Sequence, residues 1–123
     1  MNVADYLGRV YPAPGCWLLV SDVYATELSQ PVDEFRTVNA SVRAIARAFR
    51  LALHKGLRGL DQIAEPAELC VVLLGKNERL GLHHCGIYTG GKLLHWQESG
   101  VYYEEMSVIG DRYALMEFWA PAP

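Results

Sequence analysis

The chain lacks the features that mark membrane, secreted and disulfide-stabilised proteins. None of its 123 residues belongs to an apolar run near the roughly 18 residues that a membrane-spanning helix requires. Residues 1–6 have neither the basic start nor the apolar core of a signal peptide. Three cysteines, an odd number, argue against a disulfide framework and fit a reducing compartment. We therefore expect a cytoplasmic protein without a membrane partner, unless another machine exports it.

The sequence also has little net charge and no internal repeat, low-complexity tract or linker. Its formal charge is −3, so the overall charge gives no indication of nucleic-acid binding. Hydrophobic residues make up 51% and charged residues 20%, as in an ordinary globular protein rather than a disordered one. A chain of this length is large enough for one core and too small for two. Residues 1–123 are therefore predicted to form a single domain.

Two histidines in a predicted β-hairpin are the most informative feature that is present. The loop Gly90-Gly91 sets the pairing of the two strands, so that Gly86 lies opposite His95. Because side chains alternate along a strand, His84 and His95 share one face as diagonal neighbours, roughly 7–8 Å apart at the backbone. Gly86 leaves space between them. This arrangement is typical of a general base and the group that orients it.

Cys16 is the best candidate for a nucleophile among the three cysteines. Cys70 lies in the apolar run of residues 69–74, which predicts a buried strand where cysteine acts as a small hydrophobic residue. Cys85 directly follows His84, so its side chain is expected on the opposite face of the sheet and outside the site. Cys16 lies neither in a buried apolar strand nor on the far face of the hairpin, so it remains as the candidate.

The segment around Cys16 predicts the start of a helix. Prolines within residues 11–15 disfavour a helix before it, whereas apolar residues recur at helical spacing from Trp17 to Leu28. At a helix start, free N–H groups and the positive end of the macrodipole lower the pKa of a thiol, and the thiolate is the reactive form. A reactive cysteine with a histidine far away in the sequence is the general pattern of a thiol hydrolase.

A second, basic helix is predicted from about Ala40 to Lys55, capped by residues 37–39. The basic side chains that fall on one face of it are Arg43, Arg47, Arg50 and His54. This face is either a solvated surface or a contact to an acidic partner protein or an anionic cell-wall polymer.

The remaining segments predict an α+β domain. Further strands are predicted at residues 101–105 and 113–119, with a turn at Gly110-Asp111 between them. Helices therefore come first and an antiparallel sheet follows. In this arrangement Cys16 faces the hairpin across a cleft.

Three segments of the chain resemble the NlpC-type cell-wall peptidases, and within them the short tail-assembly peptidases of tailed phages. Residues 8–11 and 16–20 look like the family's glycine–tyrosine approach to its nucleophile helix. Residues 65–72 look like its Pro-Gly-Asp-Leu entry into the first central strand. Residues 84–95 look like its His-Val-Gly-Ile-Tyr hairpin with a second histidine at the end. The similarity is traceable from about residue 8 to about residue 105, with no family motif between residues 30 and 62.

This resemblance implies a papain-like NlpC-type fold, with N-terminal helices packed on an antiparallel sheet, and a Cys-His-His triad. Cys16 would be the nucleophile, His84 the general base, and His95 the residue that orients His84 and stabilises its imidazolium. Tyr11 and the backbone N–H of Cys16 would stabilise the oxyanion.

The resemblance also implies a reaction and a setting. The reaction is hydrolysis of amide bonds in peptidoglycan stem peptides, beside a diamino acid, without a cofactor or a metal. The enzyme would be phage- or prophage-derived. Phage tail proteins are then expected partners, with the virion or its tail as an alternative location to the cytoplasm.

Two other interpretations stay open. Residues 15–18 read Gly-Cys-Trp-Leu where the family usually has Asp-Cys-Ser-Gly, which fits a tail-assembly or cell-wall-binding module that keeps the fold without hydrolysis. His83, His84, His95 and the cysteines are suitable zinc ligands. However, His83 and His84 are expected on opposite faces, and no Cys-x-x-Cys pair is present. The metal site is the less favoured of the two.

Overall fold

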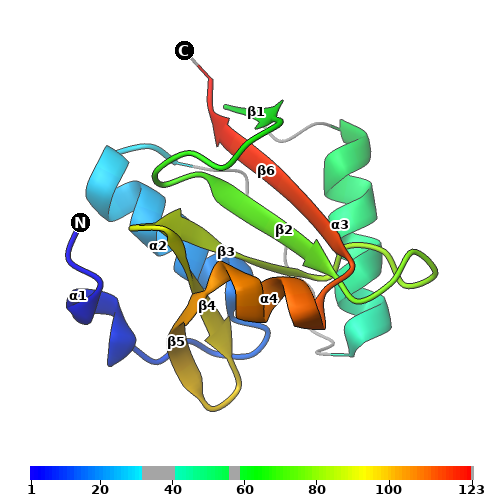
Figure 1. Cartoon of the computed structure of the whole chain (residues 1–123), viewed down its shortest axis with the longest axis horizontal. Helices are drawn as coiled ribbons and strands as arrows, with labels where there is room; N and C mark the ends of the chain where they lie inside the picture. Colours follow the sequence, from blue (N-terminus) through cyan, green and yellow to red (C-terminus); the bar gives the residue numbers. More distant parts are fainter. Residues whose placement is uncertain (32–40, 56–58, 123) are drawn as a thin grey trace.

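The computed structural model of the chain describes residues 1–31, 41–55 and 59–122 (Figure 1). Its helices and strands follow one another in the order α1 (Ala4–Leu7), α2 (Cys16–Leu28), α3 (Val42–Lys55), β1 (Leu60–Ile63), β2 (Val71–Gly75), β3 (His84–Thr89), β4 (Lys92–Gln97), β5 (Gly100–Glu105), α4 (Met106–Arg112) and β6 (Leu115–Pro121). None of the helices in these described segments is long and apolar enough to cross a membrane.

One antiparallel sheet organises the fold. Within the described residues it has six strands in the order β1-β6-β2-β3-β4-β5. The α+β class with an antiparallel sheet is thus confirmed. Strand β6 is the last in sequence, yet it lies inside the sheet and pairs with both β1 and β2.

The β3–β4 hairpin has the predicted register. Gly86 pairs with His95, and Gly90 and Gly91 form the connection with φ values of 60° and 82°. Positive φ at both loop positions matches the twist of the flanking strands and is most easily adopted by glycine.

Helices cover both faces of the sheet. The larger core cluster joins α2 and α3 to one face, including Leu19, Phe49 and Leu73. The smaller cluster joins Ile109 of α4 to the other face, where Leu74 points. Figure 1 shows α4 (orange) in front of the sheet and α2 behind it. Because both faces are covered, all five residues of β2 are buried, which explains its unbroken apolar run.

Helix α2 begins and ends for clear local reasons. Pro14 precedes it and Gly15 is its first flanking residue, while Ser29 closes it in a left-handed conformation with φ 49°. Its buried side chains include Val20 and Val23, both fully inaccessible. The hydroxyl of Tyr24 donates to the Leu69 carbonyl at 2.7 Å and so fixes α2 against the segment before β2.

The predicted turn at Gly110-Asp111 is wrong, because both residues lie in α4. Ile109 of this helix is fully buried in the smaller core cluster, with Met106 packed beside it. Their i, i+3 spacing places both on one helix face, and their burial outweighs the unfavourable helix propensity of glycine. The second predicted helix is observed as α3, whereas its predicted cap at residues 37–39 lies outside the described residues.

Candidate active site

Cys16, His84, His95 and Glu104 form a series of side chains that we call the Cys16 network. His84 Nε2 lies 2.9 Å from His95 Nδ1, and His95 Nε2 lies 2.7 Å from Glu104 Oε1. Arg112 Nη2 donates to Glu104 Oε2 at 2.6 Å. At the other end of the series, His84 hydrogen-bonds to Cys16. Three residues predicted for the site are therefore brought together by α2, β3 and β4.

The protons in this network are fixed by the burial of His95. Burial, together with the nearby His84, lowers the pKa of His95 from 6.5 to about 4, so its ring is neutral at pH 7. The hydrogen bond from Arg112 lowers the pKa of Glu104, which stays charged and accepts only. His95 must then donate from Nε2 to Glu104 and accept at Nδ1 from His84. This leaves His84 Nδ1 to exchange a proton with Cys16.

Several donors lower the pKa of the Cys16 thiol. Cys16 is the first residue of α2 and is 5% exposed. A hydrogen bond from the Cys85 side chain lowers the pKa of Cys16 well below that of an ordinary thiol, against the effect of burial. The hydrogen bond and charge of His84 and the backbone N–H of Trp17 act in the same direction. The pKa of Cys16 is thus lowered in the predicted direction, but the largest cause is the thiol of Cys85, and the helix start contributes through the N–H of Trp17.

The prediction that Cys85 lies outside the site is wrong. Burial raises the pKa of Cys85, as does its hydrogen bond to Cys16, so Cys85 is the thiol donor of the pair. His84 and Cys85 do point to opposite faces, since Cys85 packs in the cluster of α2 whereas His84 stacks on Tyr113, which follows α4. Cys16 meets both because α2 begins beside the first residues of β3, where a side chain from either face is within reach.

Glu104 was not predicted, although the sequence contains a signal for it. A two-residue loop at Glu98-Ser99 pairs His95 with Tyr102, and Glu104 is then a diagonal neighbour of His95 on the same face. Arg112 and Tyr113 had no comparable signal. Both are positioned by α4, whose packing depends on the tertiary structure.

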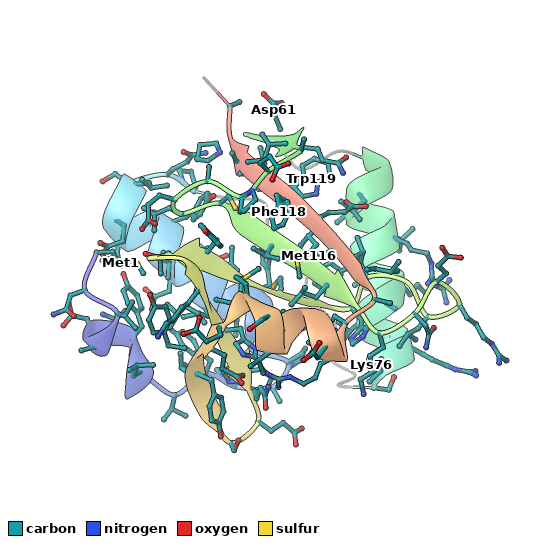
Figure 2. All side chains as sticks on the ribbon, viewed as in Figure 1. Met1, Asp61, Lys76, Met116, Phe118 and Trp119 are labelled. Atoms are coloured by element: carbon teal, nitrogen blue, oxygen red, sulfur yellow. The ribbon has the colours of Figure 1, made fainter. Side chains whose placement is uncertain are left out.

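Tyr113 fixes the plane of the His84 ring. The two rings are stacked, with centroids 5.6 Å apart and planes inclined by 13°. The ring of His83 lies 5.9 Å from the same tyrosine, and its Nε2 accepts the backbone N–H of Lys76 at 3.2 Å. His83 thus supports the end of β2, and Figure 2 labels Lys76 at this end.

A cavity of about 390 Å³ opens onto the network, and we call it the Cys16 cleft. Its wall includes Cys16 and His84 as reactive groups, and Trp96 and Tyr113 as aromatic surfaces. Lys76 contributes a cation at the same cavity. A ligand in this cleft would therefore meet the sulfur of Cys16 and the ring of His84 at once.

Two glycines allow the side chains of the site to approach one another. A Cβ at Gly15 would lie 2.6 Å from Cε2 of Trp96, so this ring occupies the space of a side chain just before Cys16. A Cβ at Gly86 would lie 2.9 Å from Cβ of His95. The predicted role of Gly86 in clearing space beside His95 agrees with this contact.

The structure gives Tyr11 a different partner from the one that its predicted oxyanion role needs. Its hydroxyl donates to Oδ2 of Asp22 at 2.5 Å, and Arg9 Nη1 donates to the same oxygen at 2.7 Å. Asp22 lies six residues after Cys16, about 9 Å along the helix. The hydroxyl of Tyr11 is thus hydrogen-bonded to Asp22, away from the start of α2 where Cys16 lies. Cys16 is the first residue of α2, so its backbone N–H lies in the first turn of the helix.

The histidine nitrogens that a metal would need are used inside the network. His84 and His95 bond each other, and His95 bonds Glu104. Among residues 1–31, 41–55 and 59–122, no group of three or more histidine, cysteine or acidic side chains is arranged to hold a metal ion.

No protein-family model matches the sequence, and no match was found among curated proteins or solved structures. The chemistry of the site is therefore inferred from its own residues. A buried thiol of lowered pKa can attack a carbonyl carbon, and the imidazole beside it can transfer a proton to the leaving group.

Proposed function

We propose that the protein is a papain-like cysteine hydrolase of the NlpC type, which cleaves amide bonds in peptidoglycan stem peptides. One observation carries this proposal: the hydrogen-bonded Cys16 network, in which a thiolate is followed by two imidazoles and a carboxylate. The motif resemblance of residues 84–95 supplies the substrate class. A phage- or prophage-derived enzyme that works with tail proteins fits the same resemblance.

In the first step of this mechanism, the substrate carbonyl enters the Cys16 cleft and the Cys16 sulfur attacks its carbon. The backbone N–H of Cys16 and the positive end of α2 stabilise the oxyanion that forms. The amide C–N bond then breaks, and the imidazolium of His84 gives its Nδ1 proton to the departing amine. The product is a thioester between Cys16 and the acyl part of the substrate.

In the second step, neutral His84 takes a proton from water, and the resulting hydroxide attacks the thioester. The C–S bond breaks, a carboxylic acid leaves, and the thiolate–imidazolium pair is restored. Nδ1 of His95 accepts a hydrogen bond from Nε2 of His84 and so holds the His84 ring in place. Glu104 accepts from Nε2 of His95 and so keeps the tautomer of His95 fixed. Neither residue needs to change its own protonation.

The decisive test is digestion of purified muropeptides, with the products identified by mass. The wild type is expected to release stem-peptide fragments, and Cys16→Ala is expected to release none. Cys70→Ala is the matched control, because Cys70 is a buried thiol in the other core cluster. Cleavage by Cys16→Ala, or no cleavage by the wild type, would count against the mechanism.

The second candidate is a tail-assembly or cell-wall-binding module without catalysis. The observation that favours it is the low exposure of Cys16, only 5%. Iodoacetamide alkylation distinguishes the two candidates. If Cys16 reacts no faster than a free thiol near pH 7, the catalytic proposal loses its basis and the binding module is favoured.

For the catalytic protein, His84→Ala is expected to slow Cys16 alkylation near neutral pH and to lower hydrolysis by about 10²–10⁴-fold, as for loss of a general acid–base group. Peptide mapping by mass assigns the alkylated thiol, and circular dichroism confirms that the variant is folded. An unchanged alkylation rate in folded His84→Ala would contradict the assigned role of His84.

A further inference from the structure

A second cavity, of about 500 Å³, is lined by arginines and is separate from the Cys16 network. Arg43, Arg47 and Arg50 come from α3, and Arg79 comes from the segment between β2 and β3. We call this cavity the arginine pocket. The three helical arginines share one face because they are spaced four and three residues apart.

These guanidinium groups are not neutralised within the described part of the chain. Arg9 pairs with Asp22, and Arg112 pairs with Glu104, whereas no ion pair or side-chain hydrogen bond between described residues occupies the four arginines of the pocket. Four cations around one cavity repel one another, and a bound anion would relieve that repulsion.

The loop opposite α3 holds its part of the pocket in a fixed shape. Asn77 Oδ1 accepts the backbone N–H of Leu80 at 2.8 Å, and the Asn77 carbonyl accepts the N–H of Gly81 at 3.0 Å. Arg50 reaches across from α3, with Nη1 4.0 Å from the position of a Cβ on Gly81. Arg79 lies within this hydrogen-bonded turn. The pocket is therefore lined by α3 on one side and by an ordered loop on the other.

The arginine pocket adjoins the Cys16 cleft at two places. On α3, Val42 lines the cleft and the next residue, Arg43, lines the pocket. After β2, Lys76 lines the cleft and the next residue, Asn77, lines the pocket. Figure 1 shows α3 beside the loop that follows β2. The two cavities are therefore lined by neighbouring residues of the same two segments, α3 and the loop after β2.

We propose that the arginine pocket is a subsite for the carboxylates of the peptide whose amide bond enters the Cys16 cleft. This inference rests on the proposed function and deepens it. Guanidinium groups bind carboxylates through paired N–H donors, and several such groups favour a peptide segment that carries more than one carboxylate. Lys76 extends the positive charge from the pocket to the cleft.

Binding is measured on Cys16→Ala, so that no turnover occurs, by titration calorimetry. The probes are a stem tetrapeptide with free carboxylates on its glutamate and diamino acid, and the same peptide with both groups amidated. The free peptide is expected to bind at least about tenfold more tightly. Adding Arg47→Gln and Arg50→Gln should remove most of that difference, and both arginines are exposed, so the fold is not at risk.

Lys92→Gln is the control for loss of a cation outside the pocket, because Lys92 pairs with Glu105 away from it. It should leave the preference unchanged. Equal binding of both peptides, or an undiminished preference in the double arginine variant, would overturn the subsite. Tight binding of inorganic phosphate that the arginine variants abolish, without any preference for the free carboxylates, would also overturn it and indicate a phosphate polymer instead.

This test separates the subsite from the proposed function. Carboxylate-dependent binding to Cys16→Ala, with no hydrolysis by the wild type, would support the subsite and reject the catalysis. Hydrolysis by the wild type with equal binding of both peptides would do the reverse.

Discussion

Among single residues, His95 has the strongest effect on how the site holds its protons. It is fully buried, and burial keeps its ring neutral although Glu104 lies 2.7 Å away. A neutral ring with Nε2–H toward Glu104 has one acceptor left, and that acceptor faces His84. The carboxylate therefore acts on His84 through the tautomer of His95 rather than through direct contact.

The lowered pKa of His95 makes stability depend on pH. The unfolded chain takes up a proton near pH 6.5, whereas folded His95 does so only near pH 4. The stabilising contribution is therefore present above pH 6.5 and is lost as the pH falls toward 4, by up to about 3 kcal/mol. Urea unfolding at pH 7 and pH 4.5 should show this loss in the wild type and a smaller one in His95→Gln. Glu104 is retained in both proteins, so an equal loss in both would refute the assignment to His95.

At the scale of elements, the start of α2 packs against β4 through the close contact of Gly15 with the Trp96 ring. Because a Cβ on Gly15 would lie 2.6 Å from this ring, Gly15→Ala should lower the free energy of unfolding by about 1–3 kcal/mol. Trp96→Leu in the same chain should recover part of that loss, although Trp96→Leu alone is destabilising. A double-mutant cycle in urea measures this coupling. Simple additivity of the two changes would exclude the steric contact as the cause.

Helix α4 places an aromatic ring on His84, and this gives a second test at the same scale. For the proposed hydrolysis, Tyr113→Leu should lower kcat/KM by about two- to tenfold, because loss of ring stacking frees the plane of His84. Tyr113→Phe keeps the ring and is the matched control, with nearly wild-type activity expected. Equal losses in both variants would show that the hydroxyl matters rather than the stack.

The elements also show which parts of the structure a sequence can predict. The β3–β4 hairpin was predictable because two glycines with positive φ fix its register, and this register places His84 beside His95. Helix α4 was not, since Gly110 weakens the local helix signal and only burial of Ile109 compensates. Contacts between segments far apart in the chain, such as that of Cys85 with Cys16, depend on where α2 begins relative to the sheet.

For the molecule as a whole, β6 is the strand on which cooperative unfolding depends most. It pairs with β1 on one side and β2 on the other, and its side chains reach both core clusters. Figure 2 labels Met116, Phe118 and Trp119 along it. A chain that ends after Ala114 should therefore lose cooperative urea unfolding, whereas one that ends after Pro121 should keep it. Cooperative unfolding of the shorter chain would mean that β6 is dispensable for the core.

The separation of the network along the chain has a consequence for the cell that makes this protein. The ribosome synthesises Cys16 early and Glu104 late, at about 5–20 residues per second. Until β3, β4 and β5 have emerged and paired, no histidine or second thiol is available to Cys16, and its sulfur has the acidity of an ordinary cysteine. The donors that lower the pKa of Cys16 therefore reach it only when the sheet is assembled, after most of the chain has been synthesised.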